Sequence, residues 1–260
     1  MIQDAILYKS VAVGFWFAFI FIAERIWRAV PAKGGCRRIG RNTGLWLINM
    51  VLSPLIILPV TFYASNYVLW NRPEWWNIVV DIVVLDFLIF WWHMANHKLP
   101  LLWRFHEVHH LDEHLDSSSA VRFHFGEVLL SAFARAAFII ILAVPFVNVV
   151  IFEGVVLAAA IFHHSNLKLP ADLERALTKI IITPSIHWVH HHAIRADTDS
   201  NYGTIFSFWD RLFKTKSLNK REYDMKIGVE GRAEKTIGKL IIKPFSQEQL
   251  PPPSTQNLAQ

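Results

Sequence analysis

The sequence WWHMANHKLPLLWRFHEVHH, residues 91–110, ends a long apolar run with a dense set of histidines. They stand mostly at helical offsets: His93, His97, His106, His109 and His110. Residues three or four apart lie on one face of a helix, so each set presents its rings together if its segment is helical. Imidazole is the commonest metal ligand among protein side chains at neutral pH. The stretch therefore predicts a metal site carried by two helical segments.

A later segment repeats the three-histidine pattern. His187, His190 and His191 have the same offsets as His106, His109 and His110. Histidine makes up 13 of the 260 residues. At that frequency, a three-histidine pattern at fixed offsets is expected by chance only ~0.03 times per chain. Two copies favour metal binding over a helix face that carries incidental histidines.

The composition indicates a membrane protein. Hydrophobic residues make up 53% and charged residues 18% of the chain, whereas soluble domains carry about 25% charged residues. The net charge of +5 does not predict a nucleic-acid partner, because the basic residues flank apolar runs and form no isolated patch with stacking aromatics. The single cysteine, Cys36, excludes an internal disulfide and a thiolate metal site, so nitrogen and oxygen must hold any metal.

Apolar segments predict four to five membrane helices. Residues 5–27, 42–71 and 77–95 are each long enough to span, with Lys9 in the first able to snorkel. The first apolar run has no cleavage site and is expected to be a retained anchor. Residues 128–162 are too long for one helix and predict a short hairpin that dips in and returns.

A basic connection sets the orientation of these spans. It contains Arg28, Lys33, Arg37, Arg38 and Arg41. The positive-inside rule makes this connection cytoplasmic, and the order of the spans then brings every histidine cluster to the same membrane face. The predicted fold is an all-α integral membrane bundle with a cytoplasmic, histidine-rich helical cap.

The chain divides into three parts on this reading. Residues 1–76 form the N-terminal spans, 77–215 the domain that carries the histidines, and 216–260 a cytoplasmic tail with a disordered end. Residues 237–242 are expected to form a short strand. The aromatic residues of 206–213 recur at helical spacing and could lie on the membrane, cover the metal site or pack in the core.

Several acids could support the histidines. Asp86 lies seven residues before His93, on the same helix face, and either supports the site or bonds another helix for packing. Other acids could orient ring N–H groups from outside the ligand set, or could simply be solvated: Asp112, Glu113, Asp116, Glu127, Asp197 and Asp199. The histidine groups together offer too many ligands for one tetrahedral zinc, which favours two metal ions.

The motifs HMANH, HEVHH and HWVHH, with RFHFGE and FHHSN between them, resemble the fatty acid hydroxylase and sterol desaturase superfamily of membrane di-iron oxygenases. The resemblance covers residues 86–215, about half the chain. It implies that residues 77–215 form the catalytic domain, with two iron ions facing the cytoplasm. It also implies O₂ activation, and hydroxylation or desaturation of an unactivated C–H bond of a lipid. The substrate could be a fatty acyl chain, a sterol, or an ether or ornithine lipid.

The resemblance also implies residue roles. It assigns ten metal ligands: His93, His97, His106, His109, His110, His124, His164, His187, His190 and His191. Asp86 and Asn166 match positions of possible support, and His114, His163 and His192 fall outside the pattern as accessory residues. The chain departs from the family pattern at Met94, where many members have arginine, and at Phe125, which replaces the usual proline after His124.

The chain contains no dinucleotide fingerprint, haem-type module or cysteine cluster, so electrons are expected from a separate protein. Basic residues could dock that donor, although topology or anionic lipid explains them equally well: Arg37, Arg38, Arg41, Lys214, Lys216, Lys220 and Arg221. The expected location is a bacterial inner membrane or the endoplasmic reticulum. The alternatives are a histidine-rich metal transporter or buffer, and an inactive scaffold.

Overall fold

The computed structural model describes residues 2–73 and 75–246, and within these ranges the chain is helical and forms no strand. The predicted disorder beyond residue 246 lies outside the described residues. The helices of the candidate membrane spans are α1 (Ile2–Ile26), α2 (Gly35–Leu52), α3 (Leu58–Asn66), α4 (Ile78–Lys98), α6 (Phe125–Leu142) and α7 (Phe146–His164). The other helical elements are α5 (Pro100–His110), η2 (Ser117–Val121), α8 (Ala171–Leu177), α9 (Pro184–His190), α10 (Arg195–Thr198), α11 (Phe208–Leu212), α12 (Ile237–Ile242) and η3 (Lys243–Phe245).

Within the described ranges, five segments are long and apolar enough to cross a membrane: Gln3–Ile26, Gly35–Asn66, Ile78–Lys98, Phe125–Leu142 and Phe146–His164. The second joins α2 and α3 through the π-helical turn η1 (Ser53–Ile57). Pro54 lies in this turn. Proline has no N–H to donate, and local rewinding of the helix accommodates that loss. The all-helical membrane fold predicted from the sequence is confirmed.

The predicted hairpin is α6 and α7, which meet at Pro145, the N-cap of α7. The two helices have 18 and 19 residues, so each is roughly 27 Å long and can cross the hydrocarbon rather than dip into it. The side chains of Tyr8, Phe15 and Phe19 on α1 are more than half exposed. A lipid environment would cover such an apolar surface.

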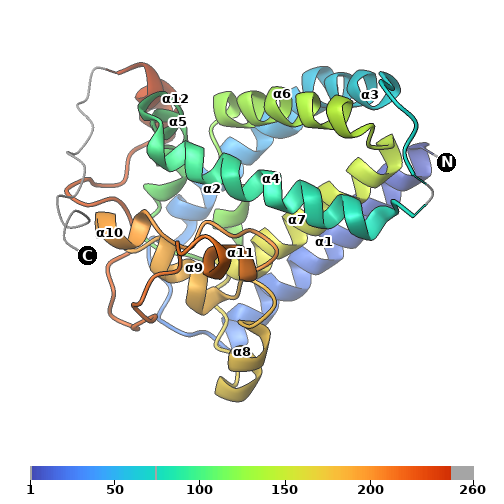
Figure 1. Ribbon diagram of the computed structural model, residues 1–260. Coiled ribbons are helices and arrows are strands. Elements are labelled where there is room, and N and C mark those ends of the chain that lie inside the picture. Colours follow the sequence, from blue (N-terminus) through green and yellow to red (C-terminus); the bar gives the residue numbers. More distant parts are fainter. Residues whose placement is uncertain (1, 74, 247–260) are drawn as a thin grey trace.

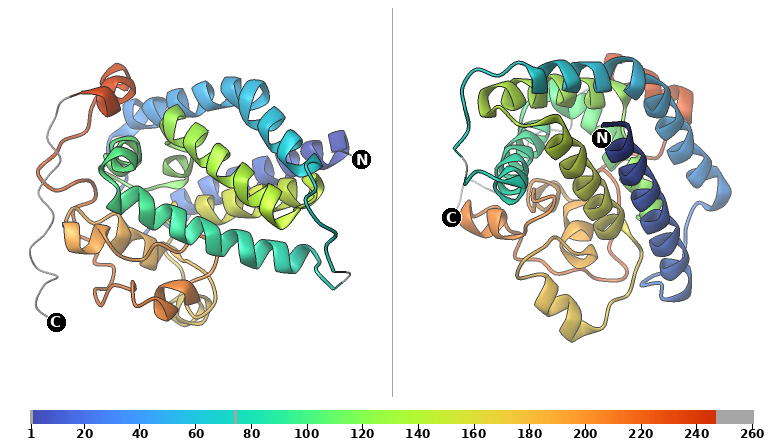
Figure 2. Two further views of the ribbon diagram at one scale, coloured as in Figure 1. Left: turned by 45° about the horizontal axis from the view of Figure 1, so that its top comes forward. Right: turned by 90° about the vertical axis from the view of Figure 1, so that its right-hand side faces the viewer.

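The long helices pack around a core between α3, α4, α6 and α7. Its buried members include Leu85, Ile139 and Phe152. Helix α1 lies along α7, where the Trp16 indole N–H donates to the Ala158 carbonyl at 2.9 Å and Ile20 packs with Ile161. Figure 2 shows α1 and α7 side by side.

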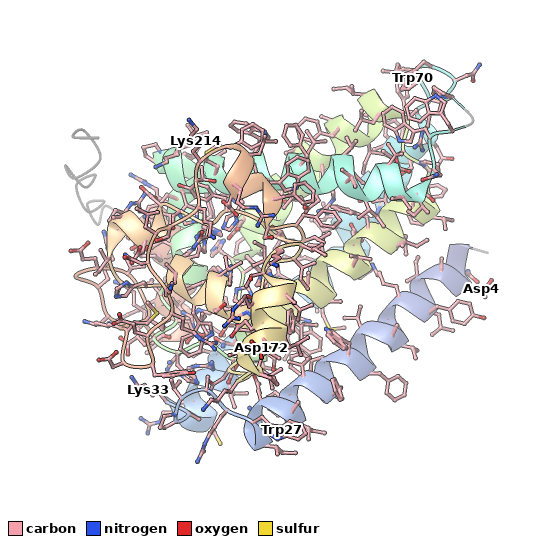
Figure 3. The ribbon with its side chains drawn as sticks, turned by 60° about the horizontal axis from the view of Figure 1, so that its bottom comes forward. Asp4, Trp27, Lys33, Trp70, Asp172 and Lys214 are labelled. Atoms are coloured by element: carbon pink, nitrogen blue, oxygen red, sulfur yellow. The ribbon has the colours of Figure 1, made fainter. Side chains whose placement is uncertain are left out.

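The shorter helices collect at one end of this bundle (Figure 1), and we call α5, η2, α9, α10, α11 and α12 the histidine cap. Figure 3 shows Trp27 and Lys33 at the cap end, and Asp4 and Trp70 at the opposite end. The connection after α1 is tied to the segment after α7, because Asn166 bonds both backbone polar groups of Val30. The basic connection therefore lies on the same side as the cap.

Two local predictions differ from the structure. Residues 237–242 form helix α12 instead of a strand, since Leu240 packs against Leu45 and Trp103 while Ile242 on the other side is exposed. Lys9 does not snorkel to the surface but pairs with Glu153 of α7 at 3.1 Å.

The aromatic segment around α11 packs on α4. Trp209 and Phe213 have ring centroids 5.0 and 5.8 Å from that of Phe87, and Phe213 lies 5.0 Å from Trp91. Asp86 holds this contact in place. Of the three roles considered for the segment, packing against a membrane helix is the one observed.

Candidate metal centre

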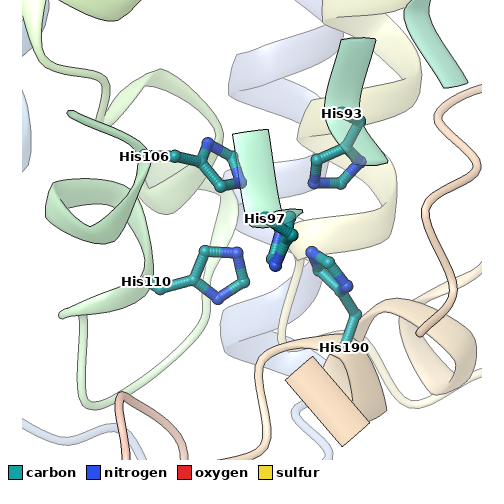
Figure 4. Close-up of side chains that lie close together, drawn as sticks. All are labelled: His93, His97, His106, His110 and His190. Atoms are coloured by element: carbon teal, nitrogen blue, oxygen red, sulfur yellow. The ribbon is translucent and has the colours of Figure 1, made fainter. Parts of the chain in front are cut away.

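Nine of the ten predicted ligands gather in two neighbouring groups of buried or half-buried histidines. The five-histidine group consists of His93, His97, His106, His110 and His190 (Figure 4). The four-histidine group consists of His109, His164, His187 and His191. In each group, one nitrogen per ring lies within 4.8 Å of all the others.

Helical geometry divides each three-histidine motif between the two groups. On α5, His106 and His110 are four residues apart and enter the five-histidine group, while His109 enters the other. On α9 and the residue after it, His187 and His191 form the matching pair of the four-histidine group, and His190 crosses over. The groups are contiguous, since the rings of His110 and His191 stack with centroids 4.2 Å apart.

The proton positions in the four-histidine group favour a bound cation. His109 Nδ1 lies 3.1 Å from the Arg122 carbonyl, and His164 Nδ1 lies 2.8 Å from the Ala160 carbonyl. A carbonyl oxygen only accepts, so both Nδ1 atoms carry the proton and both Nε2 atoms of the neutral rings hold a bare lone pair. These two Nε2 atoms are 3.0 Å apart. Two lone pairs that face each other at this distance repel, unless a cation lies between them.

The remaining nitrogens of this group have the same spacing. His187 Nε2 lies 2.9 Å from His164 Nε2 and 3.1 Å from His191 Nε2. Two nitrogens bound at right angles to one metal, each about 2.1 Å from it, would be about 3.0 Å apart. Burial lowers the pKa of His109, His187 and His191 well below the usual value, so these rings are neutral and able to bind metal at neutral pH.

Backbone carbonyls also orient rings of the five-histidine group. The Nδ1 atoms of His93 and His190 donate to the carbonyls of Tyr202 and Ser200, at 2.8 and 2.6 Å. Among the described residues, His190 Nε2, His106 Nε2 and both nitrogens of His110 are buried without a hydrogen-bond partner. Buried polar atoms are rarely left unsatisfied. Both groups therefore fit a metal ion, and neutral imidazole suits iron, zinc, copper or nickel.

Glu127 is the acid that directly supports a predicted ligand. Its Oε1 lies 2.7 Å from His106 Nδ1. Asp199 lies 3.6 Å from His97 Nδ1. Asp197 instead bonds His192, outside both groups, and Asp112 and Asp116 pair with Arg38. A carboxylate behind a ligating histidine fixes the tautomer and makes the ring a stronger base.

Glu127→Gln should therefore weaken metal binding about 10- to 100-fold, since the amide orients His106 without adding negative charge. Competition with a chelator would measure the affinity. Glu113→Gln is the control, because Glu113 accepts from the Glu234 backbone on the exposed side of the cap. Equal affinities for Glu127→Gln and wild type would contradict this role.

The structure does not bring His124 into either group. It is the N-cap of α6, where its Nδ1 accepts from the Gly126 backbone at 2.9 Å and its Nε2 donates to the Ile241 carbonyl at 3.0 Å. Both ring nitrogens are thus used by the protein. The sequence signal for this difference is Phe125, which stands where the family pattern has proline.

We expect His124→Ala to retain the full metal content of the wild type while losing a helix cap, which costs about 1 kcal/mol of stability. Metal analysis of the purified variant alongside a thermal unfolding curve would separate the two effects. Loss of a metal ion without a loss of stability would show that His124 is a ligand after all.

The two predicted support residues bond segments next to the centre and not the histidines themselves. Asp86 accepts hydrogen bonds from the backbone N–H groups of Ile205 and Phe206 and from the Trp209 indole, at 2.9–3.1 Å. Asn166 bonds Val30. Among the described residues, neither side chain hydrogen-bonds a histidine, so both hold the segments around the centre rather than the predicted ligands.

A cavity of about 260 Å³ adjoins the histidines. It is bounded at one end by His93, His106, His109, His164 and His187, and along α4 and α7 by apolar side chains such as Ile89, Phe152 and Leu157. His163, which falls outside the family pattern, also lines it, with its ring 4.0 Å from that of His187. An apolar cavity that leads from membrane helices to a metal centre is suited to a lipid chain.

Several supporting groups carry no signal in the sequence motifs. The carbonyls of Tyr202, Ser200 and Arg122 orient ligands, and any residue type supplies a carbonyl. Phe123 stacks on His109 at 4.4 Å between ring centroids. Only the tertiary fold brings these groups to the histidines.

A helical membrane bundle with a buried, divided histidine centre defines the class of protein. Residues 78–215 match the model of the fatty acid hydroxylase family, and the chain belongs to that family. No solved structure matches the chain.

Three curated relatives illustrate the range of the family. Ornithine lipid hydroxylase OlsE of Rhizobium tropici is 28% identical over 203 residues, which cover 75% of this chain and 59% of that protein. Alkylglycerol monooxygenase of Homo sapiens is 30% identical over 157 residues, or 58% and 33% of the two chains. The cholesterol 25-hydroxylase-like protein of Danio rerio is 28% identical over 144 residues, or 54% and 55%. The chain thus spans about one third to three fifths of the length of these relatives.

Proposed function

We propose that this chain is a membrane oxidoreductase that uses O₂ to hydroxylate an unactivated C–H bond of a lipid. The observation that carries the proposal is the divided histidine centre at the end of an apolar cavity between membrane helices. The relatives act on chemically different lipids, but their names all describe hydroxylases or monooxygenases. This common element favours hydroxylation over desaturation.

The proposed cofactor is a pair of iron ions, one for each histidine group. The nine imidazoles and the closeness of the groups support two ions. When bound, the iron pair would supply the redox chemistry with O₂ that no protein side chain provides. The chain itself keeps the rings neutral, fixes their tautomers through Nδ1 bonds and encloses the centre in buried side chains.

The apolar walls of the cavity would position the substrate. Ile89, Phe152 and Leu157 line the path along which a hydrocarbon chain reaches His93 and His109. Burial of that chain supplies binding free energy, and the same walls exclude water from the reacting carbon.

We further propose that the centre faces the cytoplasm and receives electrons from a separate protein. The basic connection after α1 lies at the cap end of the bundle, and the positive-inside rule favours the cytoplasm for such a segment. Arg38 is not available for a donor, because it is buried between Asp112 and Asp116. The membrane would be a bacterial inner membrane or the endoplasmic reticulum.

A metal transporter fits the geometry less well. Transporters hold their ions near the middle of the membrane on broken helices, whereas the histidines here lie at the cap ends of α4 and α7 and on the cap itself. A site at the membrane surface suits a reaction that combines a lipid chain with a soluble electron donor.

Mass spectrometry of host lipids under ¹⁸O₂ tests the proposal. Expression of the wild-type chain should produce lipids that gain one ¹⁸O atom, and His106→Ala should abolish them. The matched control is His192→Ala, a neighbouring histidine outside both groups. Identical lipid profiles for wild type and His106→Ala, with an active electron donor present, would overturn it.

A further inference from the structure

Three charged side chains lie inside the membrane bundle, away from the histidines. Arg135 of α6 and Glu153 of α7 line the cavity, and their side chains are 3.2 Å apart. Lys9 of α1 reaches the other oxygen of Glu153 at 3.1 Å. Glu153 precedes His164 by eleven residues, which places it roughly 16 Å from the cap end of α7 along the helix axis. The cavity thus has a histidine end and a charged end.

The charges at this end do not balance. Glu153 is the single carboxylate that Lys9 and Arg135 share in their ion pairs, so the set of three carries one excess positive charge. Charge inside a membrane is expensive, and charged residues there are usually paired or functional. The excess favours one additional negative charge.

The same end of the cavity has N–H donors without acceptors. Arg135 Nε and Trp92 Nε1 are buried and make no hydrogen bond with any described residue. Both side chains line the main cavity and a smaller adjoining cavity of about 20 Å³. A buried donor without a partner costs free energy, so this end of the cavity is complementary to a ligand with acceptor oxygens.

The geometry points to a carboxylate-binding subsite: we infer that the Lys9–Glu153–Arg135 set binds the carboxylate of a fatty-acid-type lipid whose chain extends to the histidines. A carboxylate brings a single negative charge and two oxygens that match the guanidinium fork. A hydroxyl would leave the excess charge in place, and a phosphate monoester would overcompensate it. This inference rests on the proposed oxidation of a lipid at the histidine centre and specifies the class of lipid.

Because the charged set and the histidines lie at opposite ends of the cavity, they also specify which end of the lipid is oxidised. With its carboxylate at Arg135, the chain runs past Val156 and Leu157 and presents its tail to the histidines. A lipid in the leaflet opposite the cap already points its tail toward the cap, so it fits without turning over. Oxidation should therefore fall on the part of the chain remote from the carboxylate.

A competition experiment tests this subsite. The full chain, loaded with iron in phosphatidylcholine nanodiscs, is photolabelled with hexadecanoate that carries a diazirine at its tail. Unlabelled hexadecanoate, ionised at alkaline pH, and 1-hexadecanol then compete for labelling. We expect hexadecanoate to compete at least about tenfold better than hexadecanol in the wild type. A hydrogen bond between a carboxylate and a guanidinium raises binding affinity by about that factor or more.

Two substitutions should act in opposite directions. Arg135→Gln should remove the preference for hexadecanoate, while Glu153→Gln should preserve or increase it, because it removes a competing negative charge. Arg175→Gln on the exposed face of α8 is the matched control and should behave as wild type. Hexadecanol competition and iron content show that each variant is folded.

Equal competition by the two lipids in the wild type would overturn the subsite, even if no variant folds. The subsite would also be overturned if Arg135→Gln kept the preference for hexadecanoate. The same holds if both substitutions abolished that preference and the iron content together, because the three charges would then have a purely structural role. None of these results bears on ¹⁸O incorporation into host lipids, so failure of the subsite is distinguishable from failure of the proposed hydroxylation.

Discussion

Replacing His187 with alanine is expected to reduce the metal content of the purified protein from two ions per chain to one at most. The four-histidine group offers four rings, and His187 Nε2 lies within 3.1 Å of the Nε2 atoms of both His164 and His191. Loss of a supporting residue already costs 10- to 100-fold in affinity or activity, so loss of the ligand should lower lipid oxidation by at least about 100-fold. Inductively coupled plasma mass spectrometry measures the metal content, and host lipid profiles measure the loss of oxidation.

The control for this substitution is His192→Ala. His192 directly follows the predicted ligands His190 and His191 in sequence, but its ring bonds Asp197 at 2.7 Å and belongs to neither group. This variant should keep both ions and full activity. If His187→Ala kept two ions per chain, the division of the histidines into two metal-binding groups would be wrong.

Asp86→Ala is expected to have the largest effect on stability, about 3–5 kcal/mol, which is typical when one partner of a buried charged contact is removed. The substitution leaves two backbone N–H groups and the Trp209 indole without their acceptor in a fully buried position. The segment around α11 would then detach from α4. Thermal unfolding in detergent, monitored by circular dichroism, would measure the loss.

Asp172→Ala is the matched control, since its side chain is 94% exposed on α8 and its ion pair is with Arg175, whose side chain is 74% exposed. Its effect should stay within about 0.5 kcal/mol. Similar unfolding temperatures for the two variants would show that Asp86 does not anchor the α11 segment.

The membrane helices and the clustering of the histidines were predictable because their signals are local. Apolar runs of the right length identify spans, and offsets of three and four identify a helix face with several histidines. Nothing local assigns His109 to one group and His110 to the other. That division depends on how α5 meets α4 and α9, and hence on contacts between residues far apart in sequence.

The differences from prediction have physical reasons. Residues 237–242 are rich in isoleucine, which favours strands, but no strand is available in the described part of the chain and Leu240 packs on one side only. His124 carries the motif spacing, but the chain uses both its nitrogens for backbone bonds. Lys9 and Glu153 lie 144 residues apart, so their ion pair could not be expected from sequence.

The count of iron ions bound per chain is the most direct test of the two-metal centre. The wild-type protein, purified from iron-supplemented cells in mild detergent, should contain two iron ions per chain by plasma mass spectrometry, and His187→Ala should contain one or none. Wild-type protein that holds no iron, or a single ion unaffected by His187→Ala, would contradict the account.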